Sequence, residues 1–398
     1  MATFRVDFLG CKVSHADAHE VREALLRDGH DEAASDAEVA VISTCCVTNE
    51  ALAKSRKAAA RAARSHRRVY LTGCGANLRG DPFAGLPSNV TVVARRSEET
   101  ATFVAGDVGA IGCVRADAHV DRVRAFVKIQ DGCSFSCNFC VIPLVRGPSR
   151  SRRAAAVLAE IRRRVRQGHR EVVLTGINLG CFRDRDAGYD LPRLVREAGA
   201  TPGLERLRLS SIEINHVDEK LVAALRETPA VSRHLHVPLQ SGDDGVLRAM
   251  KRRYTTSTYL RRLAPLADEF NLTSDVIVGF PAEDEAAFER TLRTVEAAGV
   301  TKVHVFPYSP RPGTATAAED AVAPQVKKDR SARLRALSHE LCLRRWSGKI
   351  GREDLVLVDR PGRGYGDDYT PWLVDAPVGA LVRVRAGSVT EEGIRAAA

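Results

Sequence analysis

Three cysteines in one short loop carry the clearest chemical signal in the chain. Cys133, Cys137 and Cys140 are spaced C-x3-C-x2-C, and Phe139 stands directly before the third. Three thiolates on so short a loop suit three irons of a four-iron cluster. Because ordinary ferredoxins supply four cysteines per cluster, one iron would stay open to a ligand that is not protein. The next cysteine is Cys181. A zinc site with a distant fourth ligand, or three ordinary buried thiols, are the alternatives.

Three other cysteines, far apart in the sequence, each follow a predicted strand. The strands are predicted at residues 4–9, 39–42 and 69–71. Helical patterns at 16–28 and 49–65 separate them, and this alternation predicts a parallel sheet. Cys11, Cys45 and Cys74 lie just past the strand ends. Because the carboxyl ends of parallel strands meet at one edge, where ligands bind, we expect the three thiols to converge. The alternative for each is a small buried hydrophobe.

The centre of the chain alternates strand and helix signals six times. Strands are predicted at residues 124–129, 171–175, 206–210, 231–237, 273–278 and 302–306. Helices are predicted at residues 153–167, 190–198, 217–227, 243–250, 256–269 and 284–298. This order predicts a partial (βα)6 barrel, whose active residues should lie at the C-terminal strand ends.

The 398 residues indicate two or three domains. We place their boundaries at residues 1–120, 122–335 and 340–398. Residues 95–121 read as an irregular, charged linker. The last segment has short alternating strands separated by Gly-rich turns, and it predicts a small antiparallel β-barrel.

The charge balance favours a polyanionic partner. The chain carries 60 Lys and Arg against 50 Asp and Glu, a net charge of +10. Arginines gather after the cysteine loop, and the RNA-binding candidates among them are Arg146, Arg150, Arg152 and Arg153. A solvated run of arginines is the alternative. The start of the chain lacks the pattern of a signal peptide, and no apolar run is long enough for a membrane span. Ten cysteines in such a chain favour metal or redox chemistry in a reducing cytoplasm.

The cysteine loop resembles that of the radical S-adenosylmethionine (SAM) enzymes. Further motifs resemble one branch of them, the methylthiotransferases of the MiaB, RimO and MtaB families. These motifs are GCKVSHAD, STCCVT, LTGC, VIPLVRGPSRSR, LTGINLG, HLHVPLQSG, VIVGFPAE and FPYSPRPGT. The resemblance spans roughly residues 4–315. It implies an α/β protein with an N-terminal parallel-sheet domain, a radical SAM barrel and a C-terminal RNA-binding TRAM-like β-barrel, for which a packing role is the alternative.

The same resemblance implies SAM and two four-iron, four-sulfur (4Fe-4S) clusters as cofactors. Cys133, Cys137 and Cys140 would hold the cluster that cleaves SAM. Cys11, Cys45 and Cys74 would hold an auxiliary cluster that carries the inserted sulfur. Residues implied to contact SAM are Phe139, Gly176, Asn178, Ser211, Glu213, Gln240 and Gly279. No role is assigned to Cys46, Cys113, Cys181 or Cys342.

The motifs GCKV, RAFVKIQDGC, SRSR and FPYSPRPGT resemble the MtaB type. That type implies methylthiolation at C2 of N6-threonylcarbamoyladenosine, next to the anticodon of tRNA. The alternatives are MiaB-like methylthiolation of isopentenyladenosine in tRNA and RimO-like methylthiolation of a ribosomal-protein aspartate. A non-enzymatic iron–sulfur RNA-binding module is a further alternative. The implied partners are tRNA, an electron donor of the flavodoxin or ferredoxin type, and a sulfur donor.

Overall fold

The computed structural model describes residues 2–109 and 123–397, in two compact units. The first unit comprises the described residues of Met1–His119 together with Asp131–Arg150 and Ser309–Ala318. The second comprises those of Val120–Gln130, Ser151–Tyr308 and Glu319–Ala398. The cysteine loop at 133–140 therefore belongs to the same unit as Cys11, Cys45 and Cys74. The three-domain division of the sequence stays a prediction.

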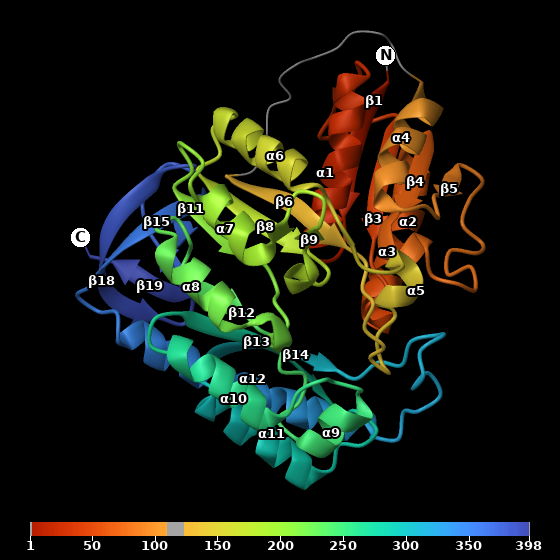
Figure 1. Cartoon of the computed structure of the whole chain (residues 1–398). Coiled ribbons are helices and arrows are strands. Elements are labelled where there is room, and N and C mark those ends of the chain that lie inside the picture. The colour runs from red at the N-terminus through yellow and green to blue at the C-terminus, as the bar shows by residue number, and fades with distance from the viewer. Residues whose placement is uncertain (1, 110–122, 398) are drawn as a thin grey trace. The chain divides into compact units, whose positions relative to one another are not determined.

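A five-stranded parallel sheet organises the first unit, in the order β2-β1-β3-β4-β5. Its strands are β1 (Thr3–Phe8), β2 (Asp31–Glu32), β3 (Val39–Thr44), β4 (Arg68–Thr72) and β5 (Val90–Val92). Its helices are α1 (Lys12–Arg27), α2 (Asn49–Ser65), α3 (Gly73–Ala76), α4 (Ser97–Val108) and α5 (Ile142–Arg146). β3 is buried along its whole length, as a central parallel strand covered on both faces must be. The predicted parallel sheet is confirmed (Figure 1).

The expectation of an irregular segment from residue 95 onward is wrong as far as residue 108. Residues 97–108 form α4, which contacts α1. Thr100 and Val104 are buried and lie one helical turn apart, and Ala105 is buried beside them. This spacing is the signal that the charged residues around it obscured. The rest of the predicted linker, with Cys113, lies outside the described residues.

The second unit contains an open arc of parallel strands, and all six predicted strands are present. They are β6 (Arg124–Asp131), β8 (Glu171–Gly176), β11 (Arg206–Leu209), β12 (His234–His236), β13 (Asn271–Val278) and β14 (Val300–Pro307). Two sheets, β11-β8-β6-β7 and β12-β13-β14, make up the arc; β7 is Arg150–Ser151. Parallel bridges from Leu207 to Val231 and from Ser211 to His236 connect the sheets. The partial (βα)6 barrel is confirmed.

Helices cover this arc and bury its apolar core (Figure 1). They are α6 (Ala154–Arg166), α7 (Leu191–Gly199), α8 (Glu219–Glu227), α9 (Asp244–Ala249), α10 (Thr256–Leu263) and α11 (Glu285–Ala297). Short 3-10 turns are η1 (Leu179–Cys181), η2 (Ile214–His216) and η3 (Ala264–Leu266). A small hairpin pairs β9 (Arg183–Asp184) with β10 (Tyr189–Asp190). Within the described ranges, none of the helices is both long and apolar enough to cross a membrane.

A long helix, α12 (Pro324–Ser347), was not predicted, and it crosses the expected boundary at residues 335–340. Half of the residues on its buried face are polar, which hides the usual apolar periodicity. Arg330 on that face donates to Glu283 at 2.8 Å, and Ser338 accepts from the backbone N–H of Val303 at 2.8 Å. Because these polar groups are satisfied, they can be buried at little cost.

The C-terminal strands close into a five-stranded barrel in the order β15-β16-β17-β19-β18. They are β15 (Glu353–Arg360), β16 (Arg363–Tyr365), β17 (Pro371–Leu373), β18 (Leu381–Thr390) and β19 (Gly393–Ala396). All pairs are antiparallel except β17 with β19, which is parallel.

This barrel contacts the N-terminal ends of the arc. Arg208 in β11 donates to Gly366 O at 2.8 Å, and Asn271, which begins β13, donates to Asp368 O at 2.8 Å. The C-terminal barrel therefore lies opposite the strand ends where a radical SAM site is expected.

Candidate active site

Cys11, Cys45 and Cys74 lie together in the first unit. Each follows a strand of the sheet, and Cys74 is carried by the short helix α3. A Cβ on Gly10, the residue before Cys11, would lie 3.5 Å from Cys45 Sγ. Burial raises the pKa of Cys74 to about 12, while Arg146 opposes this rise and the neighbouring Cys11 and Cys45 add to it. Three strand ends therefore bring these thiols within electrostatic reach of one another, and their role as ligands stays a prediction.

Cys46 takes a different direction from Cys45. Its thiol is fully buried and donates to the backbone carbonyl of Cys74 at 3.4 Å. It belongs to an apolar cluster with Val141 and Val145. The Cys46 S–H is thus directed at a backbone carbonyl, and the preference for Cys45 over Cys46 as the third ligand stays a prediction.

Arg146 connects the two cysteine regions of the first unit. Its Nε donates to Cys74 Sγ at 3.0 Å. Its two terminal nitrogens pair with Asp17 at 2.8 Å and with Asp131 at 3.0 Å. The Arg146 side chain is only 6% exposed. This corrects the expectation that Arg146 contacts RNA, because a buried guanidinium that two carboxylates neutralise is not available to a phosphate.

The other three arginines predicted to bind RNA also have hydrogen-bond or ion-pair partners within the protein. Arg150 is half-buried and donates to backbone carbonyls of its own loop. Arg152 pairs with Glu160 at 2.7 Å. Arg153 is 67% exposed and lies 3.4 Å from Asp184. Local density of arginine in the sequence therefore did not identify a free cationic surface.

The loop of Cys133, Cys137 and Cys140 follows β6 and is irregular. It begins at Gly132, whose φ is +69° and whose Cβ, if present, would lie 2.1 Å from Pro148 O. Only glycine tolerates both conditions. The glycine turns the chain sharply out of the sheet, so the cysteines follow in an open loop.

None of the three thiols of this loop is in a disulfide bond, and all three are partly exposed. Cys140 N–H donates to Cys137 O at 3.2 Å, and Thr316 donates through both its N–H and its hydroxyl to Asn138 O. Phe139 is half-buried. Three thiolates from one loop are the donor set of an iron–sulfur cluster, in which each ligand binds a separate iron.

The second unit carries the predicted SAM residues at the C-terminal ends of its strands. Gly176 ends β8, and a Cβ there would lie 3.1 Å from Gln130 Oε1. That oxygen accepts from Asn178 N–H at 2.8 Å. Within the described ranges, Asn178 Oδ1, Thr175 Oγ1 and Ser210 Oγ are buried without a hydrogen-bond partner. Buried polar atoms of this kind are expected where a polar ligand binds, so this edge fits SAM.

Ser211 and Glu213 follow β11. Ser211 forms the bridge to His236, and Glu213 pairs with Arg252 and accepts from Asn215 Nδ2 at 3.2 Å. Burial raises the pKa of Glu213, while Arg252 acts in the opposite direction. Arg252, which lies within the KRRYT segment at residues 251–255, was missed by the sequence analysis.

Gln240 and Gly279 lie at two further strand ends. Gln240 has a φ of +65°, an uncommon backbone for a residue that is not glycine. Gly279 has a φ of +73°, and a Cβ there would lie 2.4 Å from Lys327 Cγ. Its N–H donates to Glu283 Oε1 at 2.7 Å. The structure thus gathers the predicted residues of this unit along one edge, while their contacts with SAM stay predictions.

Comparison with known proteins decides the family. A model of the Radical SAM superfamily matches residues 127–295, and the uncharacterized protein family UPF0004 matches residues 3–94. The threonylcarbamoyladenosine tRNA methylthiotransferase MtaB of Thermotoga maritima is 32% identical over 99% of this chain and 96% of its own. The chain belongs to the radical SAM methylthiotransferase family. As a member it is a transferase that uses SAM and an iron–sulfur cluster.

Of two other relatives of this methylthiotransferase, one carries the same MtaB name and the other a different name. The MtaB of Bacillus subtilis is 32% identical and covers 97% of this chain and 94% of its own. The tRNA-2-methylthio-N(6)-dimethylallyladenosine synthase of Erythrobacter litoralis is 31% identical, and the match covers 96% of this chain and 94% of its own. Among solved structures, the radical SAM methyltransferase TsrM from Kitasatospora setae has a TM-score of 0.58 at 14% identity, covering 81% of this chain and 80% of its own. That likeness concerns the fold alone.

Proposed function

We propose that the chain inserts a methylthio group at C2 of N6-threonylcarbamoyladenosine, next to the anticodon of cytoplasmic tRNA. The observation that carries this proposal is similarity over nearly the whole chain to proteins named threonylcarbamoyladenosine tRNA methylthiotransferase. Such similarity covers the catalytic barrel and both flanking regions, and not the superfamily motif alone.

Cys133, Cys137 and Cys140 would hold the 4Fe-4S cluster that cleaves SAM. When bound, this cluster and SAM supply a radical able to take hydrogen from an unreactive carbon. The chain contributes position and enclosure. Gly132 directs the cysteine loop away from β6, and the buried polar atoms near Asn178 offer hydrogen bonds to SAM.

Cys11, Cys45 and Cys74 would hold a second 4Fe-4S cluster, which supplies the sulfur that is transferred. Their proximity supports this assignment. Arg146 would keep its N–H directed at the Cys74 sulfur, and hydrogen bonds to ligand sulfurs tune the potential of such clusters. An electron donor of the flavodoxin or ferredoxin type and a separate sulfur donor complete the proposal.

The first experiment is mass spectrometry of tRNA nucleosides from cells with and without the gene. We expect loss of the 2-methylthio form and accumulation of N6-threonylcarbamoyladenosine. Accumulation of isopentenyladenosine would favour the second candidate, which the similarity to the dimethylallyladenosine synthase supports. Unchanged tRNA would contradict both, and the ribosomal protein would be analysed next.

The cluster assignment is tested by replacing each group of cysteines with alanine. Loss of Cys133, Cys137 and Cys140 should abolish reductive SAM cleavage. Loss of Cys11, Cys45 and Cys74 should remove one cluster by iron analysis and electron paramagnetic resonance, and stop methylthiolation while SAM cleavage continues. Cys46→Ala is the matched control and should keep both clusters. Retained methylthiolation in the second triple variant would refute the auxiliary site.

A further inference from the structure

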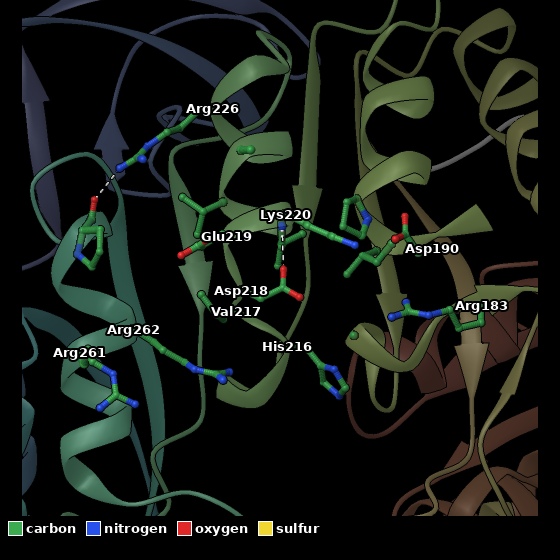
Figure 2. Close-up of a pocket in the computed structure, with 17 residues that line it drawn as sticks. Arg183, Asp190, His216, Val217, Asp218, Glu219, Lys220, Arg226, Arg261 and Arg262 are labelled. Carbon is green, nitrogen blue, oxygen red and sulfur yellow. Dashed lines mark hydrogen bonds between the residues drawn. The ribbon is translucent and has the colours of Figure 1, made fainter. Parts of the chain in front are cut away.

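The second unit has a cavity of about 850 Å³ that the proposed chemistry does not use. It lies between α7, α8 and α10 and is shown in Figure 2. Its wall includes Arg183, which follows η1, and His216, which ends η2. These two turns follow β8 and β11, so the cavity begins at the strand ends that carry the predicted SAM residues.

Four cations on the cavity wall lack a carboxylate partner within the described residues. They are Arg183, Lys220, Arg261 and Arg262. Arg262 Nη1 donates to Ile214 O at 2.8 Å, and Arg183 Nη1 donates to Phe182 O at 2.8 Å. Each bond uses one N–H of a guanidinium that has five, so both groups are oriented and still have donors to offer.

Of the acidic residues that line the cavity, two accept hydrogen bonds at helix N-termini and one is exposed. Asp190 and Asp218 cap α7 and α8, accepting from backbone N–H groups at 3.0 and 2.9 Å. Glu219 is exposed. Arg226, a fifth cation, pairs with Glu269 at 2.6 Å and is already neutralised. The four cations without a carboxylate partner therefore supply the positive charge of this wall, and Arg183 and Arg262 are the two of them that face each other.

His216 lies between these two arginines. In Figure 2 the side chains of Arg183 and Arg262 extend toward each other from opposite walls, with His216 between them. Burial lowers the pKa of His216, and Arg183 and Arg262 lower it further while Asp218 opposes them. A Cβ on Gly180 would lie 2.2 Å from the His216 ring, so glycine is needed for the ring to pack there.

We propose that Arg183 and Arg262 bind a backbone phosphate of the substrate tRNA, with Lys220 and Arg261 placed for neighbouring phosphates. Guanidinium groups bind phosphate oxygens through paired N–H donors, and cations along both walls of an open groove suit a phosphodiester chain. This inference rests on the proposed tRNA function and deepens it. Binding here would hold RNA beside the strand ends at which the radical is expected.

The test is binding of an anticodon stem-loop RNA to the full-length protein carrying both Arg183→Gln and Arg262→Gln. We expect the dissociation constant to rise on the order of tenfold near 150 mM salt, because two phosphate contacts are lost. The slope of log K against log salt should become shallower by about one, because both arginines neutralise the same phosphate. Lys220→Gln alone should change that slope by about one. A thermal melt checks that the variants fold.

The matched control removes two charges from the nearby helix α7, with Arg193→Gln and Arg196→Gln. Both arginines already pair with glutamates, so the RNA affinity should hardly change. An equal loss in the control, or an unchanged salt slope in the test variant, would overturn the phosphate site. Should wild-type protein bind this RNA through Arg183 and Arg262 but leave cellular tRNA unmodified, the proposed function fails and the phosphate site stands.

Discussion

Arg146 in the first unit and the pair Arg183 and Arg262 in the second have opposite electrostatic surroundings. Arg146 is buried and bound by Asp17 and Asp131. Arg183 and Arg262 face a cavity, bind only backbone carbonyls and have no carboxylate partner among the described residues. The comparison shows that an arginine can bind a phosphate only where the fold has not already paired it with a carboxylate.

The largest expected effect is that of Arg146→Ala. The substitution removes the guanidinium that pairs with the buried Asp17 and Asp131, and breaking a buried pair in this way costs about 3–5 kcal/mol. Urea unfolding of the protein without clusters measures it. Adding Asp17→Asn and Asp131→Asn should restore much of the loss. A loss below about 1 kcal/mol would mean that the buried pairs contribute little.

Asp368 is a buried carboxylate whose charge is stabilised by two cations, just as the charge of Arg146 is stabilised by two carboxylates. Burial alone would raise the pKa of Asp368, but Lys349 and Arg345 outweigh it and hold that pKa well below its usual range. Its stabilisation is therefore present above the unfolded pKa of about 3.9 and is lost as pH falls toward the folded pKa.

Urea unfolding between pH 6 and pH 3 tests this prediction. Asp368→Asn should flatten the acid-dependent loss of unfolding free energy by about 1 kcal/mol over this pH range. An identical pH profile for the variant and the wild type would show that Lys349 and Arg345 do not stabilise the charged form.

The unpaired arginines should matter little for stability. Arg183→Gln combined with Arg262→Gln loses one or two hydrogen bonds and leaves no buried carboxylate behind, so the unfolding free energy should change by at most about 1 kcal/mol. Thermal and urea unfolding measure it. A loss as large as that of Arg146→Ala would remove the contrast on which the phosphate site depends.

Arg153→Gln should have the smallest effect. Its side chain is 67% exposed, and exposed ion pairs contribute little because solvent screens them. The unfolding free energy should change by less than about 0.5 kcal/mol. Urea unfolding at low and at high salt checks this, and a large change that salt does not reduce would contradict it.

Much of the architecture could be predicted from local pattern. Strands at residues 39–42 and 69–71 and the helix at 49–65 were visible because buried parallel strands and amphipathic helices have distinct periods. The cysteines at strand ends followed from the same pattern, since parallel strands end at one edge. α12 was not predicted because Arg330 and Ser338 lie on its buried face, where they form hydrogen bonds with other elements.

The sequence by itself therefore determined the order of strands and helices, the open cysteine loop and the family motifs, because these depend on residues close together in the chain. Only the tertiary structure decided that Arg146 is buried against Asp17, 129 residues away, and that Arg183 and Arg262 face one cavity. Coulomb interactions depend on distance in space and on burial, and neither can be read from the local run of charges.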